Sequence, residues 1–376
     1  MAGIYVHMPF CKTICHYCDF YRIADTGDHK RFLDSLLKEA ELRKGYLSGE
    51  TISTIYFGGG TPSVFSVIEL ASILDGISRL FTIEDEREIT IELNPDDVTL
   101  SWLKDLRKAG FNRVSYGIQS WNDDILRMLN RRHNSRQSSE ALDYSLNAGF
   151  DNISVDLIYG IPGYDSTNWK RDLEITFGYP VKHLSAYHLT IEPGTVFGKM
   201  KKAGRMEETG EEESNLQFGI LVETSAAAGF IQYEISNFAK EGFFSRHNSN
   251  YWRQVSYLGL GPSAHSFNKS SRQWNISNVE KYVKAVETGK QFWKREELDQ
   301  KKRFNEYIMT SLRTIWGIDL DYVEQLFEKE GYDYVINMSG KFIDYGLMKK
   351  EGNSLILTNT GMMISDNIIS DFMITD

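Results

Sequence analysis

The segment Cys11-Lys-Thr-Ile-Cys15-His-Tyr-Cys18 contains all three cysteines of the 376-residue chain. It follows residues 4–9 (IYVHMP), whose apolar and β-branched residues predict a strand. Three cysteines in one short loop exclude a framework of several disulfides and a zinc site made of four cysteines. Three thiolates can instead hold three irons of a cubane cluster and leave the fourth iron open to a small molecule. A zinc site completed by a histidine, a redox-active cysteine pair and an incidental grouping are the alternatives.

Strand-like and helical patterns alternate over about the first 230 residues. Leu33, Leu36, Leu37 and Ala40 have the spacing of a helix that packs on a sheet. Six strand-then-helix units predict a parallel sheet with right-handed crossovers, and six are too few for a closed eight-stranded barrel. We therefore expect an α/β fold, a partial (β/α)6 TIM-like barrel. After residues 4–9, the predicted strands are residues 54–59, 88–95, 113–120, 152–160 and 183–190.

The second half of the chain has a different pattern. Helical patterns dominate from about Asn275, and a Gly352-Asn353 turn predicts a short hairpin followed by a helix. We expect a barrel over residues 1–230, a connecting segment over 231–274 and a small, mainly helical, winged-helix-like domain over 275–376.

Composition narrows the classes of function. The formal net charge of −10 argues against nucleic-acid binding as the main task. No apolar run reaches the length of about 20 residues that a membrane span needs, and the first residues lack the features of a signal peptide. We therefore expect a cytoplasmic protein with no membrane span.

A second motif gives the cysteine segment a more specific meaning. Gly58-Gly59-Gly60-Thr61-Pro62 follows the second predicted strand, and its glycines allow a ligand to approach the backbone closely. The order of the two motifs resembles the radical S-adenosylmethionine (SAM) proteins. The resemblance implies a 4Fe-4S cluster held by Cys11, Cys15 and Cys18, with the amine and carboxylate of SAM on the open iron.

Further motifs resemble one family within that superfamily, the oxygen-independent coproporphyrinogen dehydrogenases and their HemW relatives. They include Tyr5-x-His7-x-Pro9-Phe10, Glu92-Leu-Asn94-Pro95, Tyr116-Gly117-Ile-Gln119-Ser120, Asn130-Arg131 and Asp156-Leu-Ile-Tyr-Gly160-Ile-Pro162-Gly163. The similarity covers nearly the whole chain. The SAM-binding residues that it implies are Tyr5, Tyr17, Gly59, Gly60, Thr61, Glu92, Gln119, Arg131 and Asp156.

The residue types agree with this role, because several follow predicted strands, where barrel enzymes place their sites. Glu92 and Asp156 offer carboxylates for an ammonium group and ribose hydroxyls, and Arg131 offers a guanidinium for a carboxylate. Taken singly, each is better explained as a strand-end cap or a surface ion pair. Taken together, with the cysteines upstream, these residues favour a binding site.

Two differences separate the chain from the dehydrogenases. The dehydrogenases have the pattern CxxxCxxCxC, whereas Phe20 stands in the place of the fourth cysteine here. They also have a long N-terminal extension that covers the porphyrin, and the few residues before Tyr5 lead us to expect none in this protein. His247-Asn-Ser-Asn-Tyr251-Trp252 matches the HNxxYW motif of HemW proteins, which implies haem binding at His247. The alternative is a buried histidine beside core aromatic residues.

Other histidines complete the set of candidates. His265 is a second candidate for contact with haem, and His7 and His16 flank the cysteine loop, where supporting roles are expected.

The resemblance implies a haem chaperone that transfers haem to acceptor haemoproteins, such as membrane-bound respiratory enzymes, at the cytoplasmic face of the membrane. Its cofactors would be a 4Fe-4S cluster and SAM, and no catalytic residue is assigned. The alternative is an enzyme that decarboxylates coproporphyrinogen III to protoporphyrinogen IX. A third interpretation is a protein or nucleic-acid adaptor built on the C-terminal region, against which the acidic charge argues.

Overall fold

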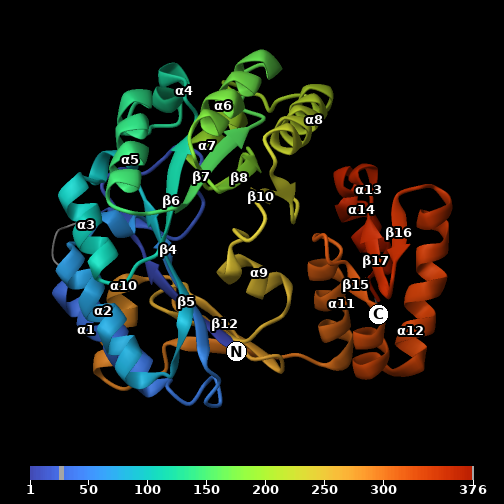
Figure 1. Cartoon of the computed structure of the whole chain (residues 1–376). Coiled ribbons are helices and arrows are strands. Elements are labelled where there is room, and N and C mark those ends of the chain that lie inside the picture. The colour runs from blue at the N-terminus through green and yellow to red at the C-terminus, as the bar shows by residue number, and fades with distance from the viewer. Residues whose placement is uncertain (25–28, 375–376) are drawn as a thin grey trace.

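A twelve-stranded sheet forms the centre of the computed structural model, which describes residues 1–24 and 29–374 (Figure 1). The strands lie in the order β14-β13-β12-β11-β1-β4-β5-β6-β7-β8-β10-β9. Since β14 and β9 are its two edges, the sheet does not close into a complete barrel. The strand bounds are β1 (Ala2–Met8), β4 (Ile52–Gly59), β5 (Ile83–Leu93), β6 (Arg113–Gln119), β7 (Asn152–Tyr159), β8 (His183–His188), β9 (Ile231–Gln232), β10 (Asn237–Ala239), β11 (Tyr257–Leu260), β12 (His265–Phe267), β13 (Ser271–Asn275) and β14 (Trp293–Glu297).

The six predicted strands are the middle of this sheet. β1, β4, β5, β6, β7 and β8 are neighbours in chain order, and each pairs in parallel with the next. The partial α/β barrel is therefore confirmed. Helices on its outside connect the strands (Figure 1): α1 (Lys30–Leu42), α2 (Val67–Leu80), α3 (Leu100–Lys108), α4 (Asp123–Met128), α5 (Ser135–Asn147), α6 (Ser166–Gly178), α7 (Val196–Lys202) and α8 (Glu211–Ala227).

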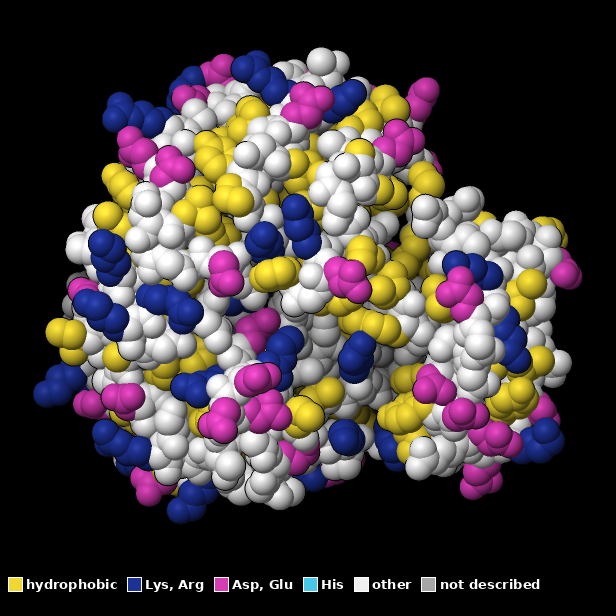
Figure 2. All heavy atoms as spheres, in the orientation of Figure 1, with side chains coloured by type: hydrophobic (Ala, Val, Ile, Leu, Met, Phe, Trp, Pro, Cys, Tyr) yellow, Lys and Arg dark blue, Asp and Glu magenta, His cyan; other side chains and the backbone are white. Residues whose placement is uncertain are grey.

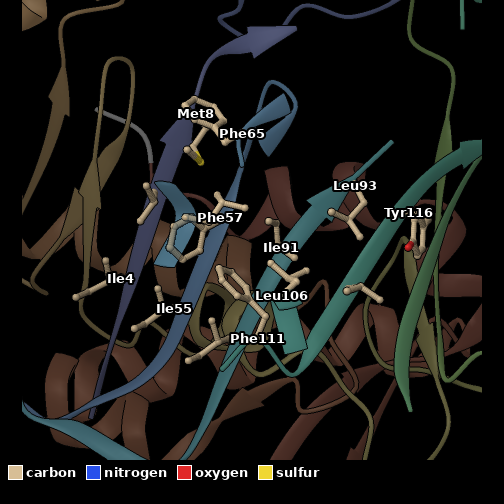
Figure 3. Packing of buried hydrophobic residues seen from close by; sticks show 14 of the residues in the cluster. Ile4, Met8, Ile55, Phe57, Phe65, Ile91, Leu93, Leu106, Phe111 and Tyr116 are labelled. Atoms are coloured by element: carbon tan, nitrogen blue, oxygen red, sulfur yellow. The ribbon is translucent and has the colours of Figure 1, made fainter. Parts of the chain in front are cut away.

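The main hydrophobic core lies between the strands and these helices. Ile4 and Met8 of β1 are fully buried, and Figure 3 shows them in line with buried side chains of β4 and β5. Because side chains alternate between the two faces of a strand, Tyr5 and His7 point to the inside of the barrel. The same alternation turns Glu92 to the inside of the barrel, while its neighbours Ile91 and Leu93 pack in the core.

Four strands extend the sheet beyond β1. β11 pairs in parallel with β1, and β12, β13 and β14 continue the sheet with antiparallel pairing. The next helix, α10 (Val279–Glu287), buries Tyr282 and Val286 in the main core. These residues were expected to belong to the C-terminal domain from 275, but their contacts assign them to the barrel.

A second hydrophobic core begins at Phe304 and ends at Phe372. We call the part of the chain from residue 300 to residue 374 the C-terminal unit, because its core is distinct from that of the barrel. Its hairpin of β16 and β17 turns at Gly352, as the sequence predicts. Its elements are α11 (Gln300–Ser311), β15 (Ile318–Asp319), α12 (Leu320–Asp344), β16 (Met348–Glu351), β17 (Ser354–Leu357), α13 (Asn359–Met363) and α14 (Ser365–Phe372).

Within the described ranges, no helix is both long and apolar enough to cross a membrane.

Candidate functional site

A cavity of about 520 Å³ lies at the carboxyl ends of the central strands. We call it the cysteine cavity. Predicted site residues that line it are Cys11, Cys15, Tyr17, Cys18, Gly59, Gly60, Thr61, Glu92, Gln119, Arg131 and Asp156. The fold thus brings eleven residues together from segments spread over 146 positions of the chain.

The cysteine loop is held at both ends. β2 (Phe10–Cys11) pairs in parallel with β3 (Ile23–Ala24), so the start and the end of the cysteine loop lie side by side. All three thiols are free, and burial raises the pKa of Cys11 and raises that of Cys18 to about 11. Metal binding at neutral pH would therefore release protons.

Two neighbours place hydrogen-bond donors against the sulfur atoms. The Thr61 hydroxyl lies 3.4 Å from the Cys11 sulfur, and an Arg131 guanidinium nitrogen lies 3.4 Å from the Cys15 sulfur. The contact from Thr61 favours the thiolate form of Cys11. In the described residues, no three histidine, cysteine or carboxylate side chains converge to hold a single metal ion.

The glycine segment passes close to the cysteine loop. A Cβ atom on Gly60 would lie 2.7 Å from the backbone oxygen of Met8 and 2.6 Å from the Pro9 carbonyl carbon. Gly59 has a φ of +106°, and a Cβ there would lie 2.4 Å from the His7 ring. Sterics therefore require glycine at both positions, and at Gly59 the left-handed backbone conformation requires it as well.

Two carboxylates face this cavity from β5 and β7. Burial, with the nearby Asp156 charge adding to it, raises the pKa of Glu92 to about 7, although the Tyr56 hydroxyl and the Gly59 amide donate to its carboxylate at 2.8 and 3.0 Å. Burial also raises the pKa of Asp156, to which the Ser115 hydroxyl donates at 3.2 Å. Burial disfavours the charged form of both, so a cation bound between them would stabilise their ionisation.

Arg131 connects the cysteine loop to the strand ends. Its guanidinium donates to the Asn94 side chain at 2.6 Å and to the Gly117 carbonyl at 2.7 Å, in addition to its contact with Cys15. Its buried Nε has no hydrogen-bond partner in the described part of the chain. Nearby, Gln119 adopts a left-handed φ of 69°, which is unfavourable for a residue other than glycine.

A second cavity, of about 410 Å³, lies beside the cysteine loop. We call it the aromatic cavity, because most of its lining residues are aromatic. Phe20 lines both cavities and is 68% exposed. Figure 2 shows hydrophobic side chains near the hollow between the barrel and the C-terminal unit. The lining residues are Tyr5, His7, Phe20, Tyr21, Tyr251, Trp252, Gln254, Tyr257, Ser263, His265, Phe267, Arg272 and Thr310.

Tyr5 differs from the other predicted SAM residues, because it lines the aromatic cavity rather than the cysteine cavity. The alternation of β1 points it to the barrel interior, where its hydroxyl lies 3.0 Å from His7 Nδ1. Tyr5 therefore lies outside the lining of the predicted SAM site.

His247 is buried rather than exposed to a ligand. It belongs to α9 (Arg246–Trp252), is 1% exposed and lies outside the lining of both cavities. Its ring nitrogens are 2.8 Å from the hydroxyls of Thr54 and Tyr251. Burial lowers its pKa to about 3. This arrangement matches the structural alternative, and the expected haem contact at this ring has no geometric support.

Comparison with known proteins identifies the family. A family model described as the radical SAM superfamily matches residues 5–174. The chain is 30% identical to the heme chaperone HemW of Bacillus subtilis (strain 168), over 99% of both chains. It is 31% identical to HemW of Lactococcus lactis, over 99% of this chain and 97% of the relative. This chain belongs to the HemW family of the radical SAM superfamily.

The fold of this HemW-family protein also occurs in a solved structure. Coproporphyrinogen III oxidase (HemN) from Escherichia coli, a radical SAM enzyme, superposes with a TM-score of 0.85 at 22% identity. The match covers 99% of this chain and 89% of HemN. At this identity the similarity supports the fold alone.

Membership of the superfamily implies SAM and a 4Fe-4S cluster, and the cysteine cavity fits both groups. Three free thiols line one wall, and a glycine segment passes behind them. The unpartnered Arg131 Nε and the two buried carboxylates offer a cation and two anions for the charged groups of SAM.

Two residues that act on this HemW-family site, Arg113 and Asn94, were given no role from the sequence. Arg113 is 1% exposed on β6, and its charge acts on Glu92, Asp156 and His247. The sequence places Arg113 at the start of a predicted strand, which indicates burial at most. The alternation of side chains along a strand does not show which charged groups come close together inside the barrel. Asn94, which bonds Arg131, was visible as part of the Glu92-Leu-Asn94-Pro95 motif but was given no role of its own.

Proposed function

We propose that this protein is a haem chaperone that binds haem beside a SAM-ligated 4Fe-4S cluster and transfers it to acceptor haemoproteins. The observation that carries the proposal is that Phe20 lines both the cysteine cavity and the aromatic cavity. One cavity has the donors for a cluster and SAM, and the other has the apolar, aromatic walls that suit a porphyrin. The HemW relatives are named as heme chaperones.

In this proposal, Cys11, Cys15 and Cys18 hold the cluster, which leaves one iron free to bind SAM and supplies electrons when reduced. Glu92, Asp156 and Arg131 orient SAM through charge. Tyr17, Gly59, Gly60, Thr61 and Gln119 complete the wall of that site.

The protein would work in the cytoplasm and meet its acceptors at the membrane face. Membrane-bound respiratory enzymes are the acceptors that we propose.

The test is an anaerobic transfer assay with the reconstituted protein, haem and an apo-haemoprotein. We expect stoichiometric haem uptake and its transfer to the acceptor, followed by absorbance. The Cys15→Ser variant should lose cluster absorbance, while free haem without the protein controls for spontaneous transfer. Absence of uptake by the wild type would contradict the proposal.

A second candidate function is the decarboxylation of coproporphyrinogen III, the reaction of the dehydrogenases whose sequence motifs this chain resembles. Phe20 argues against it, because it stands where the dehydrogenases have a fourth cysteine. Incubation with coproporphyrinogen III, SAM and reductant decides between the two. Formation of protoporphyrinogen IX would replace the chaperone proposal with the enzymatic one.

A further inference from the structure

The aromatic cavity contains two histidines with different surroundings. His7 is 5% exposed, and its ring nitrogens lie 3.0 Å from the Tyr5 hydroxyl and 3.1 Å from the Tyr21 carbonyl oxygen. His265, at the start of β12, is exposed at the cavity wall. Among the described contacts, neither His265 ring nitrogen has a hydrogen-bond partner, so this ring is available to a ligand.

The His265 ring is also held in place. It stacks on Trp274 of β13, with ring centroids 6.2 Å apart and an interplanar angle of 22°. The two residues are direct partners in the β12–β13 ladder. On the other side, a Cβ atom on Gly259 would lie 2.1 Å from the His265 backbone oxygen, so β11 and β12 are in close contact. The backbone of His265 is therefore held between β11 and β13, and its ring lies beside that of Trp274.

The protonation state suits metal binding. Although the ring is partly exposed, desolvation by the cavity walls, assisted by the Arg272 charge, lowers the pKa of His265 from its usual value of 6.5. The ring is then neutral near pH 7, which is the form that coordinates iron.

The other walls suit a flat apolar molecule with acidic groups. Tyr251 and Trp252 of the HNxxYW motif line the cavity together with Tyr257 and Phe267. Gln254 also lines it, and the buried amide nitrogen of Gln254 has no hydrogen-bond partner within the described ranges. Such a donor is suited to a carboxylate oxygen.

We propose that the aromatic cavity is the haem site and that His265, rather than His247, is the axial ligand of the haem iron. One ring nitrogen of His265 would coordinate the iron, while Tyr251 and Trp252 cover the porphyrin and Gln254 donates to a propionate. His247 supports this wall from behind through its hydrogen bond to Tyr251. The inference rests on the proposed haem binding and specifies where it occurs.

The test is a haem titration of the full chain, followed by absorbance and electron paramagnetic resonance, with the His265→Ala and His247→Gln variants. We expect His265→Ala to lose the histidine-ligated spectrum and to raise the dissociation constant for haem about tenfold or more. Added imidazole should restore the spectrum. His247→Gln should keep the wild-type spectrum, because glutamine can still bond to Thr54 or Tyr251.

Circular dichroism and cluster absorbance of each variant show whether it has folded. If folded His265→Ala keeps the wild-type spectrum and affinity, the inference is wrong even though the protein binds haem. If His247→Gln loses the spectrum while remaining folded, His247 is the ligand and the inference is also wrong. Failure of the wild type to bind haem would instead overturn the proposed function. Gln254→Leu gives a second test, with weaker haem binding and an unchanged iron spectrum as the expected result.

Discussion

At the scale of single residues, Glu92 has a carboxyl group whose protonation state changes near neutral pH. Its pKa of about 7 means that the carboxylate takes up a proton as the pH falls through neutrality. Because the ionised form attracts the ammonium group of SAM, we expect the affinity for SAM to fall below pH 7, by up to about tenfold per pH unit. Calorimetric titration between pH 6 and pH 8 measures this. The slope should vanish in Glu92→Gln, and a flat wild-type profile would contradict the assignment.

The same shift makes a prediction about stability without ligands. The pKa of Glu92 is higher in the folded protein than its usual 4.5, so the folded state binds more protons than the unfolded state between pH 4.5 and about 7. The contribution of Glu92 to stability is therefore present below pH 4.5 and is lost as the pH rises to 7. Relative to Glu92→Gln, the wild type should lose up to about 3 kcal/mol over this window. Denaturant unfolding at several pH values measures the difference, and parallel curves for the two proteins would show that it is absent.

Which inward residues share a cavity was the least predictable part at this scale. The motifs placed Glu92, Asp156 and Arg131 in one site, and the structure brings all three to the cysteine cavity. They also placed Tyr5 in the SAM site and His247 in contact with haem, whereas the structure puts Tyr5 in the lining of the aromatic cavity and buries His247. Sequence spacing does not show which hydroxyl groups satisfy a buried imidazole. Thr54 and Tyr251 do so here, from 193 positions away and from four.

At the scale of elements, the attachment of α9 decides whether the aromatic cavity keeps its shape. The Glu88 carboxylate accepts from the backbone amides of Arg246 and His247 at 3.0 Å, and the Ser245 side chain caps Asn248. We expect Ser245→Ala to lower the free energy of unfolding by about 1 kcal/mol. The substitution should also weaken haem binding, because Tyr251 and Trp252 of α9 line the aromatic cavity.

Ser66 provides the matched control for this prediction. It caps α2 in the same way, away from both cavities. Ser66→Ala should therefore cost similar stability in chemical denaturation and leave haem binding unchanged. Equal effects of the two variants on haem binding would remove the proposed role of α9.

The elements that follow the repeated strand-then-helix pattern could be predicted, and those that extend it could not. The six central strands each have a local apolar pattern and a helix after them. The β1–β11 ladder joins Ile4 to Leu258, and no local signal marks such a distant pairing. β14 is also a largely exposed, charged edge strand, so its sequence (WKREE) lacks a core-facing pattern.

At the scale of the whole molecule, a half-buried ion pair connects the barrel to the C-terminal unit. Arg272 of β13 donates to Glu306 of α11 at 2.5 and 3.0 Å, and both side chains are less than one-third exposed. We expect Glu306→Gln to destabilise the protein by about 1–3 kcal/mol, since Arg272 loses its charged partner. Limited proteolysis should then release the C-terminal unit faster.

An exposed ion pair between α11 and the edge strand β14 serves as the control. Lys302 and Glu296 lie 2.7 Å apart, with side chains 48% and 42% exposed. Glu296→Gln should change stability by less than about 1 kcal/mol, because solvent screens this pair. A proteolysis pattern that is the same for both variants would indicate that the Arg272–Glu306 pair does not hold the unit in place.

Phe20 gives the two cavities a common wall, and this has a thermodynamic consequence. A charged or electron-rich group bound in one cavity would lie beside a side chain that also lines the other cavity. Occupancy of the aromatic cavity should therefore shift the reduction potential of a cluster in the cysteine cavity. Linkage requires the reverse as well, so reduction of the cluster would change the affinity for the porphyrin by the same factor. The affinity of the protein for the porphyrin would then depend on whether the cluster is oxidised or reduced.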